Sequence, residues 1–384
     1  MKKHEQVREP FVRMVKRDNM PAWRRAVVYA VAVLLALAVC SLTIVLFTGL
    51  NPLEVFATMF QTTFGTPDLA WKNRAISIWT TVRDTMILLC VALALVPAFR
   101  MRFWNIGGEG QVLAGALAAA ACMICLSDKL PNGALIAVMA VSSIAAGAIW
   151  GLIPAIFKAK WNTNETLFTL MMNYVATQLV AYFVIIWESP KGSGKVGIIN
   201  QATELGWLPQ IGNYKYLLNI IIVAVLTVGM YIYLNYSKHG YEIAVVGESE
   251  RTARYVGIKV EKVIVRTMLL SGAICGIAGL LLVGGTDHTI STTIAGGRGF
   301  TAVMVSWLAK FNPIFMILTS FLLVFLDRGA GEISTTFGLN HSFADILTGI
   351  ILFFIIGSEF FITYKISFRR SAKNAEKEGG TANV

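Results

Sequence analysis

The stretch RFWNIGGEGQVLAGALAAA, residues 102–120, combines a carboxylate, a cluster of glycines and the start of a long apolar run. A helix needs about 20 apolar residues to cross roughly 30 Å of hydrocarbon, and the run that opens here is long enough. Similar runs recur along a chain of 384 residues, of which 56% are hydrophobic and 14% charged. They are too uniformly apolar for the alternating strands of a membrane barrel. The sequence therefore predicts an all-α, polytopic membrane helical bundle.

The apolar runs also predict the number and position of the helices. The eighth and ninth runs are short and are separated by KFNP, residues 310–313, so we expect half-helices or a re-entrant pair there. In all, about ten helices are expected, near residues 26–50, 75–98, 104–126, 133–157, 164–187, 215–236, 263–286, 299–311, 313–327 and 343–364.

The basic residues indicate the orientation of the chain. The net charge is +11, but Lys and Arg flank the apolar runs on alternate sides, which points to lipid headgroups rather than nucleic acid. With the N-terminus inside, the cytoplasmic segments hold about 24 of the 33 Lys and Arg residues, as the positive-inside rule expects. We therefore expect an integral membrane protein with a cytoplasmic N-terminal segment (1–25), a transmembrane domain (26–364) and a cytoplasmic basic tail (365–384).

The sequence carries no pattern typical of an enzyme or a metal protein. Cys122 and Cys125 have the spacing of a redox or metal pair, but no second pair or His neighbour accompanies them, so we expect both to pack as small apolar side chains. There is no P-loop, nucleophile elbow or HExxH motif. We expect no catalytic residue, metal site or cofactor.

The longest internal cytoplasmic loop, residues 237–262, contains the charged sequence VVGESERTARYVGI. Ser249 can cap a short helix and Gly257 can end it. A helix of two turns is unstable alone in water, so it must lie against its own bundle or another protein. Either it forms a docking surface or it is a solvated loop on the headgroups. The docking surface would consist of Glu248, Ser249, Glu250, Arg251, Arg254, Tyr255, Val256, Gly257 and Ile258.

Polar side chains within the apolar runs mark a candidate pathway. Glu109 needs a partner or water, because an unpaired carboxylate in hydrocarbon is strongly unfavourable. It either lines a pathway or has a purely structural role in helix packing and capping. Asn173 and Tyr174 fall near mid-membrane, where they would bind a polar ligand or another helix. Adjacent Arg83 and Asp84 favour a hydrated external mouth. The candidate pathway residues are Trp79, Arg83, Trp104, Asn105, Glu109, Gln111, Asn173, Tyr174, Arg298 and Phe300.

A second glycine cluster resembles the first. GGEG begins at Gly107 and GGRG begins at Gly296, which are 189 positions apart, and the same offset carries the second apolar run onto the seventh. The first cluster lies on the cytoplasmic side of its helix and the second on the external side. Glycine-interrupted helices of opposite direction are typical of an inverted repeat, with coincidence as the alternative.

Four motifs together resemble a known family. FWNIGGEGQ, NETLFTLMMNY, VVGESERTARYVGI and GGRGFTAV, in this order, are similar to the signatures of bacterial ABC-transporter permeases of the branched-chain amino acid and ribose group, and most similar to its simple-sugar and nucleoside branch. The resemblance covers about residues 75–364. The EAA-loop pattern of other ABC permeases is not well matched.

The resemblance implies a subunit of a heteromeric importer in the bacterial plasma membrane. Its partners would be a second permease subunit in a heterodimer, a cytoplasmic ATPase, and an extracytoplasmic binding protein or lipoprotein. The segment that matches residues 246–258 would be the coupling element seated in the ATPase, which fits the missing P-loop. The substrate is predicted to be a nucleoside, with a simple sugar as the alternative. An ion-coupled secondary transporter is the competing class, with Glu109 as its candidate coupling carboxylate.

Overall fold

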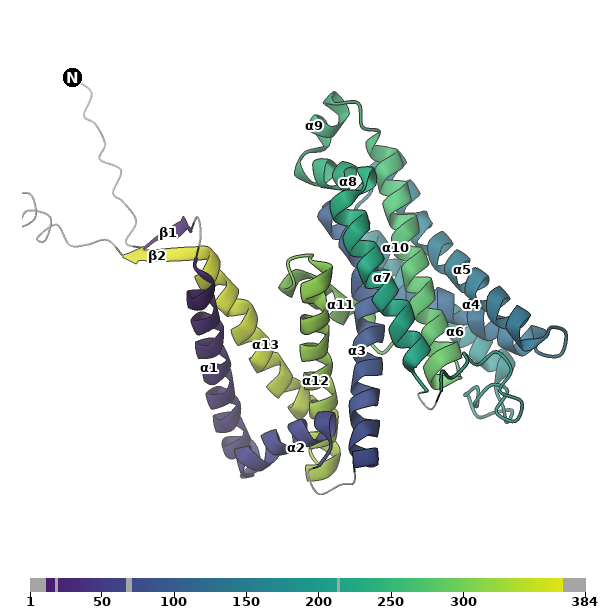
Figure 1. Cartoon of the computed structure of the whole chain (residues 1–384), viewed down its shortest axis with the longest axis horizontal. Helices are drawn as coiled ribbons and strands as arrows, with labels where there is room; N and C mark the ends of the chain where they lie inside the picture. Colours follow the sequence, from purple (N-terminus) through teal and green to yellow (C-terminus); the bar gives the residue numbers. More distant parts are fainter. Residues whose placement is uncertain (1–11, 18–19, 67–70, 213–214, 369–384) are drawn as a thin grey trace, which may run out of the picture. The chain divides into compact units, whose positions relative to one another are not determined.

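The computed structural model describes residues 12–17, 20–66, 71–212 and 215–368 (Figure 1). Within these residues, nine helices are long and apolar enough to cross a membrane, which confirms the predicted all-α polytopic bundle. In chain order the elements are β1 (Val12–Lys16), α1 (Ala22–Thr48), α2 (Pro52–Phe64), α3 (Trp71–Arg100), α4 (Gly108–Leu126), α5 (Asn132–Trp161), α6 (Glu165–Trp187), α7 (Leu217–Tyr236), α8 (Lys238–Glu248), α9 (Glu250–Tyr255), α10 (Val260–Leu282), the π-helical turn η1 (Val283–Asp287), α11 (Arg298–Leu308), α12 (Pro313–Phe337), α13 (His341–Thr363) and β2 (Tyr364–Phe368).

Each of the ten expected segments contains a helix, but the lengths differ from the prediction in one place. α11 has 11 residues and is too short to cross a membrane, as expected for the eighth segment. The prediction of a short ninth helix is wrong, because α12 has 25 residues and is long and apolar enough to cross. Its apolar run is interrupted by Arg328, which pairs with Asp84 and is thereby tolerated. The helices α2 and α8 and the β1–β2 pair were not predicted.

The chain packs as two units. The first comprises residues 1–60 and 329–384, and within it α1 packs against α13. Tyr29 Oη donates a hydrogen bond to Glu359 Oε2 over 2.6 Å, and β1 pairs antiparallel with β2, with Val12 opposite Phe368. Much of the expected N-terminal segment and nearly all of the basic tail lie outside the described residues.

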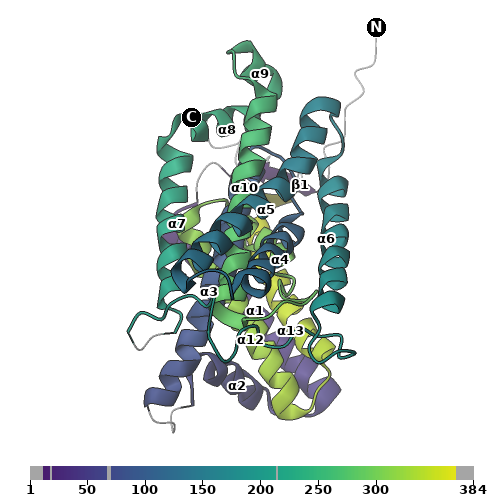
Figure 2. The ribbon, with the colours of Figure 1, turned by 90° about the vertical axis from the view of Figure 1, so that its right-hand side faces the viewer.

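The second unit, residues 61–328, is built around α10. α10 packs against α3, α4 and α5, and α6 packs against α4 (Figure 2). Two GxxxG sequences make the closest of these contacts, GAIWG (147–151) on α5 and GAICG (272–276) on α10. A Cβ added at Gly147 would collide with the carbonyl oxygen of Gly272, so the two backbones touch. The Ser143 hydroxyl reinforces the contact by donating to the carbonyl of Gly276 over 3.1 Å.

The order of elements supports the inverted repeat. The offset of 189 positions carries α3 onto 260–289, which coincides with α10 and η1, and it carries the start of α4 onto the start of α11. α3 and α10 run in opposite directions side by side (Figure 1). The Cys90 thiol lies 3.8 Å from the carbonyl of Ile274, while Arg100, the last residue of α3, lies beside Gly247, which precedes α10.

Gly276→Ala tests the packing of α10. A Cβ at this position would meet the backbone of Ser143, which can move only if α5 moves with it. We expect the free energy of unfolding in detergent micelles to fall by about 1–3 kcal/mol, the usual cost of overpacking. Gly229→Ala on α7 is the matched control, since nothing lies within 4 Å of a Cβ there. Equal stability of the two variants would contradict the close packing.

Candidate functional site

Two helices that begin with glycine clusters meet at one carboxylate. Glu109 lies in the first turn of α4. Its Oε1 accepts a hydrogen bond from the backbone N–H of Gly297 over 2.9 Å, and its Oε2 accepts one from that of Gly299 over 2.7 Å. Because these amides begin α11, the carboxylate lies at the positive ends of two helices at once. We call this arrangement the Glu109 latch.

The glycines around the latch are required by close backbone approach. A Cβ added at Gly299 would collide with the backbone nitrogen of Glu109, and a Cβ at Gly108 would lie 3.6 Å from the Cα of Gly299. Gly297 has φ +70°, a left-handed conformation that a residue with a side chain adopts only with strain. The two clusters recognised in the sequence therefore contact one another. The sequence suggested that the two clusters are equivalent positions of an inverted repeat. It did not suggest that they are in contact.

Three predicted pathway amides hold the segment that enters α4. Asn105 is fully buried; its Oδ1 accepts from the Gly107 N–H over 3.0 Å and its Nδ2 donates to Ser271 Oγ over 3.1 Å. Buried Gln111 donates to the same Asn105 oxygen over 3.3 Å. These contacts tie the segment to α10.

A third amide holds the same segment from α6. Asn173 accepts from the Gly110 N–H over 2.8 Å and donates to the carbonyl of Ile106 over 2.9 Å. Its neighbour Tyr174 is 68% exposed. Thr169 adds a further bond, accepting from the Ile106 N–H over 3.2 Å. The amides of Asn105, Gln111 and Asn173 are thus engaged in holding backbone and each other.

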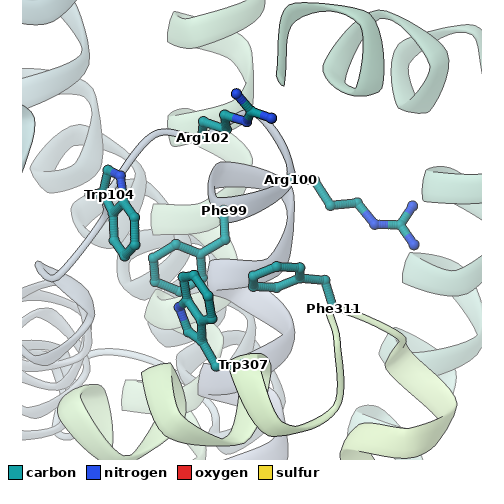
Figure 3. A pocket seen from close by; sticks show the side chains of 6 residues that line it. All are labelled: Phe99, Arg100, Arg102, Trp104, Trp307 and Phe311. Carbon is teal, nitrogen blue, oxygen red and sulfur yellow. The ribbon is translucent and has the colours of Figure 1, made fainter. Parts of the chain in front are cut away.

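Aromatic side chains gather beside the latch in a cavity of about 360 Å³ (Figure 3). Trp104 lies in the segment that enters α4, and Trp307 lies near the end of α11. Their rings stack with centroids 5.4 Å apart and an interplanar angle of 19°. Of the two, only Trp104 was predicted from the sequence. The cavity is lined by Phe99, Arg100, Arg102, Trp104, Trp307 and Phe311. Predicted Phe300, on α11, is 44% exposed, and predicted Trp79, on α3, is partly buried.

A charged cluster near the middle of α3 joins this helix to α12 and to the residue that precedes α7. Asp84 accepts from Arg83 over 2.8 Å and from Arg328 of α12 over 2.9 Å. The Arg83 guanidinium also lies 5.0 Å from the ring centroid of Tyr216. Arg298, another predicted pathway residue, lies between the latch residues Gly297 and Gly299 in the sequence. Its guanidinium donates to the carbonyl of Ile294, in the loop before α11, over 3.3 Å. Arg328 was missed, because its position within an apolar run gave no sign of its partner.

The charged loop forms the short helix that its sequence predicts. Ser249 Oγ accepts from the Thr252 N–H over 3.2 Å at the start of α9. Gly257 ends it with φ +84° and donates to the carbonyl of Arg254 over 3.1 Å. Tyr255 is 93% exposed and Val256 is exposed beside it. The loop therefore presents an apolar tip rimmed by charge.

The exposed tip rests on a rigid base. The helices α8, α9 and α10 enclose a buried apolar cluster with the end of α3, and Ala253 of α9 and Ile243 of α8 are both fully buried in it. Glu242 of α8 accepts from Arg266 of α10 over 2.8 Å, and this bond lowers the pKa of the Glu242 carboxyl. α8 is therefore fixed to α10 by apolar contact and by an ion pair. We call this end of the second unit the α9 end (Figure 1).

The latch makes a prediction about stability. Glu109→Gln keeps one acceptor oxygen for two amides, whereas Glu109→Leu leaves the N–H groups of Gly297 and Gly299 without their acceptor. We expect unfolding free energies lower by about 1–3 kcal/mol for Gln and by about 3–5 kcal/mol for Leu, measured in micelles. Exposed Glu332→Gln is the control. A Leu variant as stable as the control would show that the latch does not hold α11.

Comparison with known proteins identifies the family. Residues 77–356 match the sequence model of the branched-chain amino acid transport system permease component. The chain is 26% identical to the glucose ABC transporter permease protein TsgB13 of Haloferax volcanii, over 95% of this chain and 97% of that protein. It is 30% identical to the guanosine ABC transporter permease protein NupP of Bacillus subtilis, over 85% of this chain and 92% of that protein.

Two further relatives carry nucleoside names. The nucleoside ABC transporter permease protein NupB of Lactococcus lactis is 25% identical over 80% of this chain and 84% of its own length. A second guanosine permease of Bacillus subtilis, NupQ, is 24% identical over 59% of this chain and 73% of its own length. The chain belongs to the permease family of the branched-chain amino acid transport system, and it is a polytopic membrane permease.

Proposed function

We propose that this chain is the permease subunit of an ATP-driven nucleoside importer in the plasma membrane, with ATP hydrolysed on a separate subunit. The observation that carries the proposal is α9, an exposed apolar tip with Tyr255 at its centre on a base that is fixed to α10. A loop that only lies on lipid headgroups would not need to be fixed to α10 in this way. Seated in a cytoplasmic ATPase, α9 would pass the motion of that ATPase to the bundle. In this proposal the α9 end and both termini face the cytoplasm.

The route from α9 to the latch runs through packed backbone. α10 follows α9 directly and packs against α4 over its length. A Cβ at Gly279 of α10 would collide with the backbone of Ala116 on α4, so the helices cannot slide without disturbing each other. Glu109 begins α4 and holds α11. We infer that displacement of α9 moves α4 and α11 relative to each other, and that the latch acts as a gate.

The proposed role of Glu109 disfavours a secondary transporter. An ion-coupling carboxylate must exchange a proton or an ion during each cycle. Both oxygens of Glu109 are engaged by backbone amides, so neither is free to take part in such an exchange. We therefore assign a positioning role, at the starts of α4 and α11, to Glu109, Asn105, Gln111 and Asn173. The remaining predicted residues are assigned to the pathway and its external mouth: Trp104, Phe300, Tyr174, Trp79, Arg83 and Arg298.

The relatives support a nucleoside as the substrate. NupP and NupB are named for guanosine and nucleosides, and the exposed aromatic side chains Trp104 and Phe300 suit a flat base. Glucose is the second candidate, because TsgB13 matches nearly the whole chain. NupP and NupQ, two guanosine permeases of one organism, support a second permease subunit as partner. An extracytoplasmic binding protein or lipoprotein would deliver the substrate.

The coupling role predicts that Gly257→Pro and Tyr255→Asp abolish transport while the permease stays folded and inserted. Proline cannot adopt the φ of +84° at position 257, and aspartate removes the apolar tip. The measurement is substrate uptake and ATPase activity of the reconstituted complex. Tyr255→Phe is the matched control, because it keeps the apolar ring, and it should transport normally. Stimulated ATPase activity that survives both disruptive changes would refute the docking role of α9.

The substrate is tested by uptake in cells with and without the gene. We expect deletion to reduce uptake of labelled adenosine or uridine by at least about tenfold, with ribose, glucose and leucine uptake unchanged, since the pathway and its partner select the substrate class. Lost glucose or ribose uptake with normal nucleoside uptake would assign the sugar branch. Lost leucine uptake would contradict both assignments.

A further inference from the structure

The cavity beside the latch is walled by a closed ring of four aromatic side chains. Trp104 stacks on Trp307, Trp307 packs edge-on against Phe311 at 5.4 Å, Phe311 lies 6.0 Å from Phe99, and Phe99 lies 6.2 Å from Trp104. The two indoles remain 42% and 49% exposed. A volume of about 360 Å³ is within the range of small-ligand sites. The cavity offers flat apolar faces to a ligand of modest size.

The polar groups around the cavity suit a neutral ligand with hydrogen-bond acceptors. No carboxylate is among the six residues that line it. The guanidinium groups of Arg100 and Arg102 point away from the aromatic ring (Figure 3), and that of Arg100 donates to the carbonyl of Leu234 over 3.4 Å. Neither indole N–H of Trp104 or Trp307 has a hydrogen-bond partner among the described residues. Indole N–H groups normally find an acceptor, and a ligand in the cavity can supply one.

The cavity is connected to the moving parts of the permease. Trp104 directly precedes Asn105, which is fixed to α10 through Ser271. Trp307 lies on α11, whose first turn is held by Glu109. The two stacked indoles thus lie on the segment that enters α4 and on α11, so any movement of these two segments relative to each other changes the space between the rings. Arg100, at the rim, packs beside Gly247 of α8, so the cavity lies toward the α9 end.

We propose that this cavity is a nucleobase-binding site on the cytoplasmic side of the latch, the last station before release. The base stacks on the exposed face of one indole, and the ribose, in the open part of the cavity, accepts hydrogen bonds from the indole N–H groups at the ring edges. The proposal rests on the proposed function, in which the substrate is a nucleoside. A flat conjugated ring covers the exposed face of an indole over its full area, whereas a puckered sugar presents only part of one face.

Photolabelling of the assembled complex in membranes tests the site. 8-Azidoadenosine is activated by light and the labelled peptides are mapped by mass spectrometry. We expect label in the peptides that contain residues 99–104 or 307–311, and competition by adenosine but not by ribose. Trp307→Leu should reduce this label about tenfold, as loss of base stacking does elsewhere, and Trp307→Phe should retain most of it.

The same membranes are used for the control variant and for the measurements that could contradict the proposal. Trp161→Leu removes an exposed tryptophan that does not line the cavity, and it should leave the label unchanged. Label outside these peptides, or label in them that resists Trp307→Leu, would overturn the site, as would stronger competition by ribose or glucose than by adenosine. Adenosine uptake by the wild-type complex is measured in parallel. Its absence would refute the proposed substrate, while the position of the label still decides the cavity.

Discussion

One carboxylate shared between two helix N-termini is the interaction on which the second unit depends. The first N–H groups of α4 and α11 have no acceptor within their own helices. Glu109 supplies negative charge to both and direct acceptors to Gly297 and Gly299. The arrangement requires glycine at the contact, because any side chain would collide with the opposing backbone. It follows that the glycine clusters and the carboxylate form one structural element.

The same interaction is the contact that we propose to open during transport. Most of the second unit is held by contacts that change only at high cost, such as the GxxxG contact between α5 and α10. The latch consists of two hydrogen bonds between Glu109 and the start of α11, and the aromatic cavity is lined by residues just before α4 and near the end of α11. At the other end of α10, α9 presents an exposed tip on a fixed base. In the proposed mechanism, α10 connects the docking surface on α9 to the latch.

The sequence predicted the class of fold and the local features that depend on neighbouring residues. Hydrophobic length gave the spans, and Ser249 and Gly257 gave the bounds of α9, because caps act within one turn. Contacts between distant segments were not predictable in this way. The amide of Asn105 looked like a ligand contact, yet its partners lie on α10 and in its own loop. Likewise, nothing near Arg328 in the sequence indicates Asp84, so α12 was predicted to end too early.

The most direct test of this account is a cryo-electron microscopy structure of the assembled transporter in the nucleotide-free and ATP-trapped states. The account predicts that α9 is seated in the ATPase in both states. It also predicts that both oxygens of Glu109 bond the Gly297 and Gly299 amides in one state and that this contact is broken or displaced in the other. A latch that is identical in both states while the pathway opens, or a Glu109 that faces lipid in both, would contradict it.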